Sequence, residues 1–196
     1  MHRKLGVLMM ALGLAMLAGA AGLILHNRTE QANADASAQV ALDQIRVAMA
    51  QAEESAEDET LPEEMPVMLI DGEEYIGYLE MPTIGVTLPV MKDWSYPKLR
   101  VAPCRYSGSP QDGAMVIMAH NYDRHFGQIK DLPIGAPVQF IDANGRIYRY
   151  VVDAHDTLGK YDVEEMLSDG WDLTLFTCTY GGESRVTVRL KSVLTY

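Results

Sequence analysis

Residues 171–190 read WDLTLFTCTYGGESRVTVRL. Two alternating runs rich in β-branched residues flank Gly181 and Gly182, which is the pattern of a β-hairpin with a two-residue loop. With the two glycines as the loop, Cys178 pairs with Arg185, and their Cβ atoms should lie about 4.5 to 5.5 Å apart. The sequence therefore predicts that a thiol and a guanidinium are cross-strand neighbours.

The same register divides the hairpin into two faces, because side chains alternate along a strand. The apolar face, which we expect to point into a core, holds Leu173, Leu175, Val186, Val188 and Leu190. The other face, which we expect to be reachable from solvent, holds Thr174, Phe176, Cys178, Arg185, Thr187 and Arg189. A structural cysteine would more naturally lie among the aliphatic residues, so this position of Cys178 favours a chemical role.

Upstream of the hairpin, from Glu74 on, further strand-like runs alternate with turn residues. Asn144-Gly145 predicts a second hairpin, since this pair tolerates the positive φ angles of a type I′ turn. We expect strands at 75–80, 86–91, 114–119, 138–141, 147–154, 173–178 and 185–194, with short helices at 122–130 and 162–167. These elements predict a mainly β domain that closes into a barrel, with a sandwich as the alternative.

The amino-terminal segment is predicted to lie in a membrane. Leu5 to Leu25 is a run of 21 residues without a charged or polar side chain, and as a helix it would be about 31 Å long, enough to cross a bilayer. Arg3 and Lys4 precede it, which places the amino terminus in the cytoplasm and the rest of the chain outside. We therefore expect residues 1–28 to be a membrane anchor. A cleaved signal peptide is the alternative.

Acidic residues are concentrated between this anchor and the β domain. The chain has a formal net charge of −11, and residues 29–75 hold 13 acidic residues and one basic residue. Such a chain lacks the basic face that nucleic-acid binding requires. We expect residues 29–73 to be an acidic spacer outside the membrane, with a solvated run at 53–59 and the folded domain at 74–196. The helix expected in this spacer carries one apolar stripe against the domain: Leu42, Ile45, Met49 and Ala52.

A nucleophilic Cys178 would need a nearby base, because an isolated thiol is mostly protonated at neutral pH. Arg185 can donate hydrogen bonds to a thiolate or an oxyanion, but it does not deprotonate. The candidate base is His120, which follows the apolar strand 114–119 and is therefore held by a rigid element. His125 and His155 are the alternatives that spacing leaves open.

These residues carry a resemblance to a known family. Thr174-Leu175-Phe176-Thr177-Cys178, with Arg185 after it and Ala119-His120-Asn121 before it, resembles the motif of the sortases, the cysteine transpeptidases of Gram-positive bacterial surfaces. The membrane segment and the mainly β domain agree with this layout, and the resemblance covers roughly residues 74–196.

The resemblance implies an eight-stranded barrel with short peripheral helices and a site made by His120, Cys178 and Arg185. The cysteine would cleave a carboxy-terminal sorting signal of a surface protein, and an amine of the cell-wall precursor or of a pilin would resolve the thioacyl-enzyme. His120 would be the acid and base, and Arg185 would hold the oxyanion. Residues 155–171 correspond to a loop of the sorting-signal groove. We expect its carboxylates to form a solvated face, or alternatively to attract the cationic amine: Asp156, Asp162, Glu164, Glu165 and Asp169.

Other functions have less support in the sequence. No nucleotide-binding motif and no metal-ligand spacing is present, so we expect neither a cofactor nor a metal. The nucleophile also lacks the His-Gly-Cys surroundings expected of an L,D-transpeptidase. The alternative from a different class is a membrane-tethered binding module with structural cysteines, and a disulfide between Cys104 and Cys178 would support it.

Overall fold

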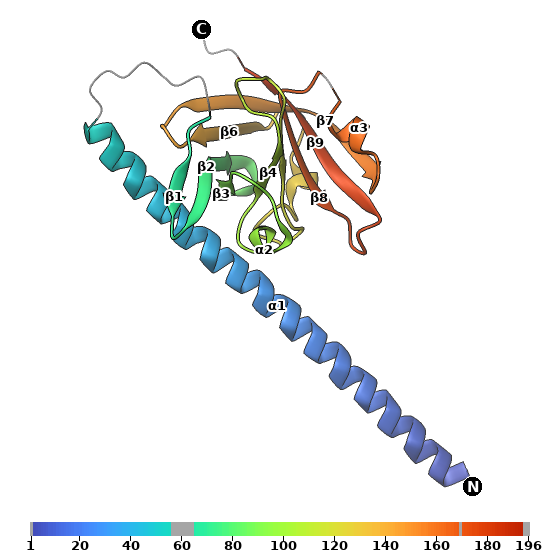
Figure 1. Ribbon diagram of the computed structural model, residues 1–196. Helices are drawn as coiled ribbons and strands as arrows, with labels where there is room; N and C mark the ends of the chain where they lie inside the picture. The colour runs from blue at the N-terminus through green and yellow to red at the C-terminus, as the bar shows by residue number, and fades with distance from the viewer. Residues whose placement is uncertain (1, 56–64, 169, 194–196) are drawn as a thin grey trace.

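The computed structural model describes residues 2–55, 65–168 and 170–193, and shows a long helix, α1 (His2–Ser55), beside a β-barrel (Figure 1). Its short helices are α2 (Tyr96–Leu99), α3 (Val163–Met166) and the 3-10 turns η1 (Pro82–Ile84) and η2 (Ile129–Asp131). Its strands are β1 (Met68–Ile70), β2 (Glu73–Met81), β3 (Val86–Met91), β4 (Cys104–Ser107), β5 (Met115–Met118), β6 (Pro137–Asp142), β7 (Ile147–Gly159), β8 (Leu173–Cys178) and β9 (Ser184–Ser192).

The sheet closes into an eight-stranded barrel. The strand order is β1-β2-β3-β4-β5-β8-β9-β7-β6, and an additional pairing of β2 with β6 closes the eight strands β2 to β9 into a ring. Gly77 permits this closure, because it has a φ of +139° and a Cβ there would lie 1.9 Å from the Ile141 carbonyl oxygen. β1 lies outside the ring as a short hairpin partner of β2. The prediction of a closed barrel is confirmed, and the sandwich alternative is excluded.

The barrel interior is filled by aliphatic and aromatic side chains from nearly every strand. Leu173, Leu175, Val188 and Leu190 are fully buried in this cluster, and Val186 packs at its edge. The expected core face of the β8–β9 hairpin is therefore correct. At about 25 cal/mol for each Å² of apolar surface removed from water, such burial is the main stabilising contribution to the fold.

The opposite face of the hairpin is less exposed than its alternating pattern indicates. Phe176, Thr187 and Arg189 are buried, with exposed fractions of 5%, 0% and 2%. Met166 of α3 packs with Phe176 and Val116 over this face. The face is covered because the segment between β7 and β8 folds back onto the barrel, which the pattern of a two-strand hairpin cannot reveal.

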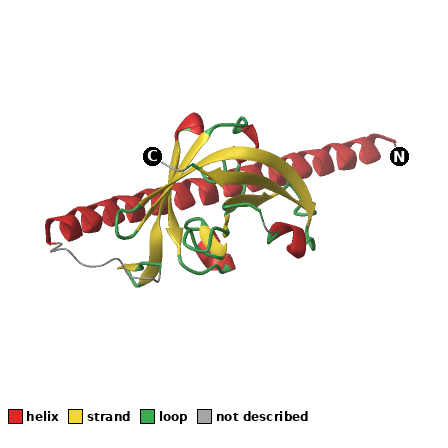
Figure 2. Ribbon diagram, turned by 90° about the horizontal axis from the view of Figure 1, so that it is seen from above, coloured by secondary structure: helices red, strands yellow, loops and turns green. Residues whose placement is uncertain are grey.

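α1 is continuous through the expected anchor and into the expected spacer. Its apolar amino-terminal part is exposed and extends past the barrel (Figures 1 and 2), and α1 holds a segment long and apolar enough to cross a membrane. Leu42, Ile45 and Met49 are buried against the barrel, as the stripe predicts. The side chain of Ala52 and most of the 53–59 run lie outside the described residues.

Three local predictions are wrong or incomplete. Residues 122–130 form turns and η2 instead of an α-helix, because the loop folds back on itself. The Phe126 N–H donates to the His120 carbonyl, and a Cβ at Gly127 would lie only 2.7 and 2.9 Å from the Tyr122 and Asn121 carbonyl oxygens. β1 and β4 were not predicted, since runs of three and four residues give little periodicity. The Asn144-Gly145 hairpin forms, but Gly145 alone in that loop has a positive φ and its N–H donates to the Asp142 carbonyl, so the turn is not type I′.

Candidate active site

Parallel pairing of β5 and β8 places His120 beside Cys178. The register pairs Met118 with Phe176, so the residues that follow these two come together at the same end of the barrel. The Ala119 N–H donates to the Phe176 carbonyl at 3.2 Å, and the Thr177 hydroxyl donates to the Ala119 carbonyl at 2.8 Å. Thr177 is buried, so this bond fixes the backbone of both strands immediately next to the two candidate residues.

Cys178 and Arg185 are paired across β8 and β9, as the hairpin register predicts. Both side chains are half-buried. Arg185 Nη1 donates to the Gly182 and Ser184 carbonyls at 2.9 and 3.1 Å, which leaves Nε and Nη2 without a partner among the described residues. The turn begins one residue earlier than expected, because the Gly182 N–H donates to the Thr179 carbonyl. The pairing of Cys178 is unaffected.

Of the three candidate histidines, His120 is the one that lines a pocket with Cys178 and Arg185. Burial is the main cause that lowers the pKa of His120, Arg100 lowers it further, and Glu30 opposes both. The imidazole is therefore favoured in its neutral form, which can accept a proton. His155 lies on β7 and its Nε2 is 2.8 Å from the Leu132 carbonyl oxygen. His125 is completely buried.

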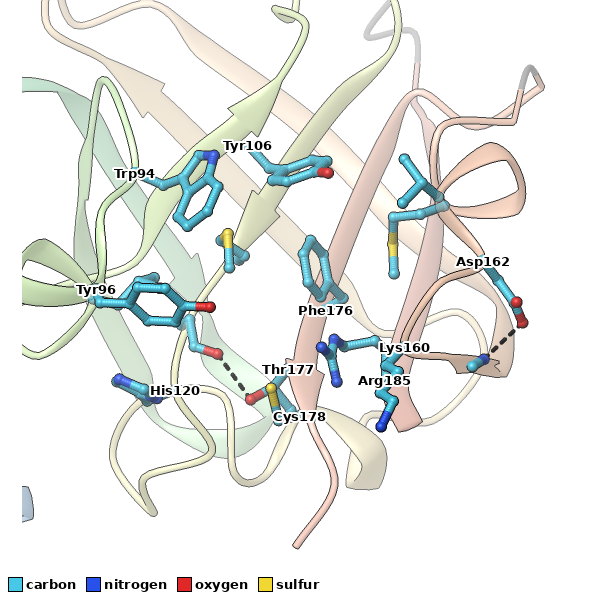
Figure 3. A pocket seen from close by; sticks show the side chains of 16 residues that line it. Trp94, Tyr96, Tyr106, His120, Lys160, Asp162, Phe176, Thr177, Cys178 and Arg185 are labelled. Atoms are coloured by element: carbon cyan, nitrogen blue, oxygen red, sulfur yellow. Dashed lines mark hydrogen bonds between the residues drawn. The ribbon is translucent and has the colours of Figure 1, made fainter. Parts of the chain in front are cut away.

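The pocket has a volume of about 240 Å³, and Cys178 lies between His120 and Arg185 in the close view (Figure 3). One wall is aromatic. Trp94 contacts Tyr96 edge-to-face with ring centroids 5.9 Å apart, and Tyr106 contacts Phe176 in the same way at 5.6 Å. Trp94 and Tyr106 join the two pairs at 6.1 Å. Such a wall can bury the apolar side chains of an extended peptide.

Sequence reasoning missed three members of this wall. Trp94 and Tyr96 lie between β3 and β4, and Tyr106 lies on β4. The available signal was weak: two aromatic residues stand close together in a segment without strand or helix periodicity, where aromatic side chains need a partner surface.

The opposite wall is held in place by a buried arginine. Arg189 Nη1 donates to the Met166 carbonyl at 3.0 Å and to the Thr174 hydroxyl at 3.1 Å, and Nη2 donates to the Glu165 carbonyl at 2.5 Å. Its Nε makes an ion pair with Asp156 at 3.1 Å. Two carbonyls at the end of α3 are thus tied to β9, and α3 contributes Val163 and Met166 to the pocket.

Two of the carboxylates in residues 155–171 have polar partners in the structure. Asp156 is paired with Arg189, and Asp162 accepts the Gly159 N–H at 2.7 Å. Glu164 and Glu165 are exposed, and Asp169 lies outside the described residues. The expectation of a solvated acidic face fits Glu164 and Glu165, while the attraction of a cationic amine stays a prediction.

The two cysteines are both free, so no disulfide occupies Cys178. Cys104 is buried on β4 and its Sγ contacts the Ala102 carbonyl at 3.5 Å. Burial raises the pKa of Cys104 to about 12, which makes this thiol unreactive at neutral pH. Within the described residues, no group of three His, Cys, Asp or Glu side chains is arranged to hold a metal ion.

Comparisons with known proteins agree with this geometry. A family model described as a sortase domain matches residues 79–193, more than half of the chain. A sortase D5 transpeptidase from Clostridium perfringens has a similar structure, with a TM-score of 0.62 at 17% identity, over 81% of this chain and 99% of that chain. No match was found among curated protein sequences.

Two sortase C structures are also similar. Sortase C1 from Streptococcus suis has a TM-score of 0.54 at 25% identity, over 77% of this chain and 81% of that one. A sortase C from Clostridium perfringens, solved with the C-terminal cell wall sorting motif, has a TM-score of 0.56 at 21% identity, over 79% of this chain and 90% of that one. Because the family model matches more than half of the chain and the barrel has the same fold as the sortase structures, this chain belongs to the sortase family of transpeptidases.

Proposed function

We propose that this sortase is a cysteine transpeptidase in which Cys178 is the nucleophile, His120 the acid and base, and Arg185 the oxyanion donor. The observation that carries the proposal is that one pocket is lined by these three side chains, which come from the ends of β5, β8 and β9. A neutral imidazole and a guanidinium beside a half-buried thiol meet the requirements for activating it and for stabilising the charge that develops.

The reaction follows from these positions. His120 accepts the proton of the Cys178 thiol, and the sulfur attacks the scissile carbonyl carbon. Arg185 donates hydrogen bonds to the oxyanion of the tetrahedral intermediate. When the carbon–nitrogen bond breaks, protonated His120 gives its proton to the leaving amine and a thioester remains on Cys178.

The second half of the reaction reverses these steps with a different amine. The incoming amine attacks the thioester carbonyl, His120 takes the proton from its nitrogen, and a new amide forms as the carbon–sulfur bond breaks. The proton then returns to the Cys178 sulfur, so the enzyme is regenerated. No cofactor or metal takes part in this sequence of steps.

The substrates we infer are the carboxy-terminal sorting signals of surface proteins, with an amine of the cell-wall precursor or of a pilin as the acceptor. The aromatic wall of Trp94, Tyr96, Tyr106 and Phe176 is suited to an extended peptide with apolar side chains. One similar structure is described with a cell wall sorting motif, and another for its pilin substrate specificity.

We also infer that residues 1–28 anchor the enzyme in the cell membrane, that 29–73 link it to a catalytic domain of residues 74–196, and that this domain lies outside the cell. The exposed apolar part of α1 supports the anchor. The basic residues before that part, and the acidic ones after it, support the orientation.

A panel of fluorogenic sorting-signal peptides, incubated with the full chain in detergent micelles, tests the proposed chemistry. We expect cleavage of at least one peptide, faster turnover when an amine is added, no turnover by Cys178→Ala and nearly none by His120→Ala. Cys104→Ala is the matched control and should retain activity. Activity of Cys178→Ala would refute the proposal, and an inert thiol with no turnover on any peptide would favour a binding module.

A further inference from the structure

Three ring side chains, those of His120, Tyr122 and His125, form a stack of tilted rings, and His120 at one end lines the pocket. The ring centroid of Tyr122 lies 4.9 Å from that of His120, at an interplanar angle of 31°, and 5.5 Å from that of His125, at 52°. His120 and Tyr122 are half-buried, and His125 is fully buried. Rings at these separations are in contact, so Tyr122 limits the orientations open to the His120 imidazole.

The backbone around this stack is tightly folded. The Phe126 N–H donates to the His120 carbonyl at 3.2 Å, and the N–H groups of His125 and Gly127 donate to the Tyr122 carbonyl at 3.0 and 2.9 Å. A Cβ at Gly127 would lie 2.7 Å from that same carbonyl oxygen. The loop 120–127 therefore has one compact shape that sets where the Tyr122 ring can lie.

α1 supports the underside of this loop. Ala34 and Ala38 are buried, with exposed fractions of 3% and 0%, and Ala38 belongs to the same apolar cluster as Phe126. Asp35 makes an ion pair with Arg124 at 3.6 Å. The first part of the helix to touch the barrel after the apolar segment is thus the part that carries the loop of His120.

We propose that Tyr122 is the positioning residue of the His120 imidazole, and that α1 at residues 34–38 is the platform that keeps Tyr122 in place. The membrane-anchoring helix is then a structural part of the active site as well as a tether. This inference rests on the proposed role of His120 as acid and base.

The ionisation of His120 gives a readout specific to this role. Burial and Arg100 lower the pKa of His120, and Glu30 of α1 raises it. Tyr122 and His125 are titratable groups near this ring, and Tyr96, Cys178 and Arg185 line the same pocket. Loss of the Tyr122 ring would admit water and move the pKa of His120 upward, toward its ordinary value of 6.5.

The test compares Tyr122→Ala with Tyr122→Phe in the full chain in micelles. For Tyr122→Ala we expect kcat on the best peptide of the panel to fall by about tenfold or more, with KM nearly unchanged, because a misplaced acid–base group slows the chemical step. NMR titration of the His120 C2 proton should show a raised pKa. Tyr122→Phe keeps the stack and should restore both properties.

The platform is tested with two nearby alanines on α1. Ala34→Leu adds bulk where the helix meets the loop and should reproduce the Tyr122→Ala effects on kcat and on the His120 titration. Ala32→Leu places the same side chain at an exposed position and should behave as the unmodified protein does.

The outcomes separate this inference from the proposed function. If His120→Ala is inactive while Tyr122→Ala keeps the original kcat and the original His120 titration, the positioning role is overturned and the proposed function stands. If Ala34→Leu and Ala32→Leu are indistinguishable, the platform is overturned. If His120→Ala is itself fully active, the proposed function fails first.

Discussion

At the residue scale, the two thiols lie in opposite environments. Cys178 is half-buried at the pocket, whereas Cys104 is fully buried and has a pKa of about 12. We predict that iodoacetamide at pH 7.5 alkylates Cys178 and leaves Cys104 unmodified in the folded chain, as peptide mass mapping would show. Unfolding in urea should make both react. Equal labelling of the two cysteines before unfolding would contradict the assignment of Cys104 as inert.

The oxyanion role of Arg185 is predicted to require the several hydrogen-bond donors of its planar guanidinium as well as its positive charge. Nη1 is engaged by the Gly182 and Ser184 carbonyls, so the oxyanion would be bound by the remaining nitrogens. A lysine has a single ammonium and cannot keep the turn and the oxyanion bonded together. Arg185→Lys should lower kcat by about a hundredfold, measured with the same peptide panel. Activity close to that of the unmodified enzyme would exclude the oxyanion role.

His125 makes the folded state sensitive to acid. Burial lowers the pKa of His125 to about 4, and the neighbouring His120 contributes to this decrease. Asp35 and the backbone of Ala34 act in the opposite direction without cancelling it. Because the unfolded chain binds this proton near pH 6.5 and the folded chain does not, stability is lost as the pH falls from 6.5 toward 4. Between pH 7 and 5 the cost is about 2 kcal/mol.

This cost should disappear in His125→Phe. Urea unfolding at pH 7 and at pH 5 should show a smaller decrease in the free energy of unfolding for this variant than for the unmodified chain. His155→Gln, at an exposed position, is the control and should keep the full decrease. An equal decrease in His125→Phe would mean that His125 does not titrate in this window.

At the scale of elements, Arg189 ties α3 to the barrel. It is 2% exposed and makes four contacts: two with carbonyls of α3, one with Asp156 of β7 and one with Thr174 of β8. We predict that Arg189→Met lowers the free energy of unfolding by about 3 kcal/mol, because buried carbonyls and a hydroxyl lose their donor. It should also raise KM for the peptide, since α3 lines the pocket.

Arg146→Met is the matched control for Arg189, because Arg146 is exposed in the β6–β7 turn. Chemical denaturation and steady-state kinetics measure the two effects. If both variants lose the same small amount of stability and keep the same KM, the buried arginine does not organise the pocket wall.

Local strand pairings could be predicted from the sequence, whereas pairings between distant strands could not. The pairing of Cys178 with Arg185 was predictable, because a short loop fixes the register of a local hairpin. The meeting of His120 with Cys178 depends on parallel pairing of β5 and β8, whose bridging hydrogen bond joins residues 58 positions apart. No periodicity within one strand carries that information, so position alone gave His120 only a preference over His125 and His155.

The sequence did not predict the covered face of the hairpin or the aromatic wall, and the physical reason is the same for both. Both arise from segments without regular periodicity that fold onto the barrel: the segment before β8, and the one between β3 and β4. Alternation along β8 and β9 identifies which side chains share a face, but it does not show what packs on that face. Thr177 illustrates this, since its hydroxyl donates to the Ala119 carbonyl, which lies outside the hairpin.

At the scale of the whole molecule, one helix, α1, connects the apolar segment to the loop that carries His120. The apolar run ends at Leu25, and the first half-buried residue of α1 that follows is Glu30, about 7.5 Å further along the helix axis. With the apolar segment in a bilayer, the barrel would therefore be held close to the membrane surface. A rigid connection of this kind would fix both the distance and the orientation of the pocket relative to its acceptor.

The most direct test of the account is intact-mass spectrometry of the full chain, incubated with the best sorting-signal peptide and quenched with acid before the acceptor amine is added. We predict an adduct with the mass of the acyl fragment, located on Cys178 by peptide mapping, absent in Cys178→Ala and present in Cys104→Ala. An adduct on Cys104, or peptide turnover by Cys178→Ala, would contradict the account.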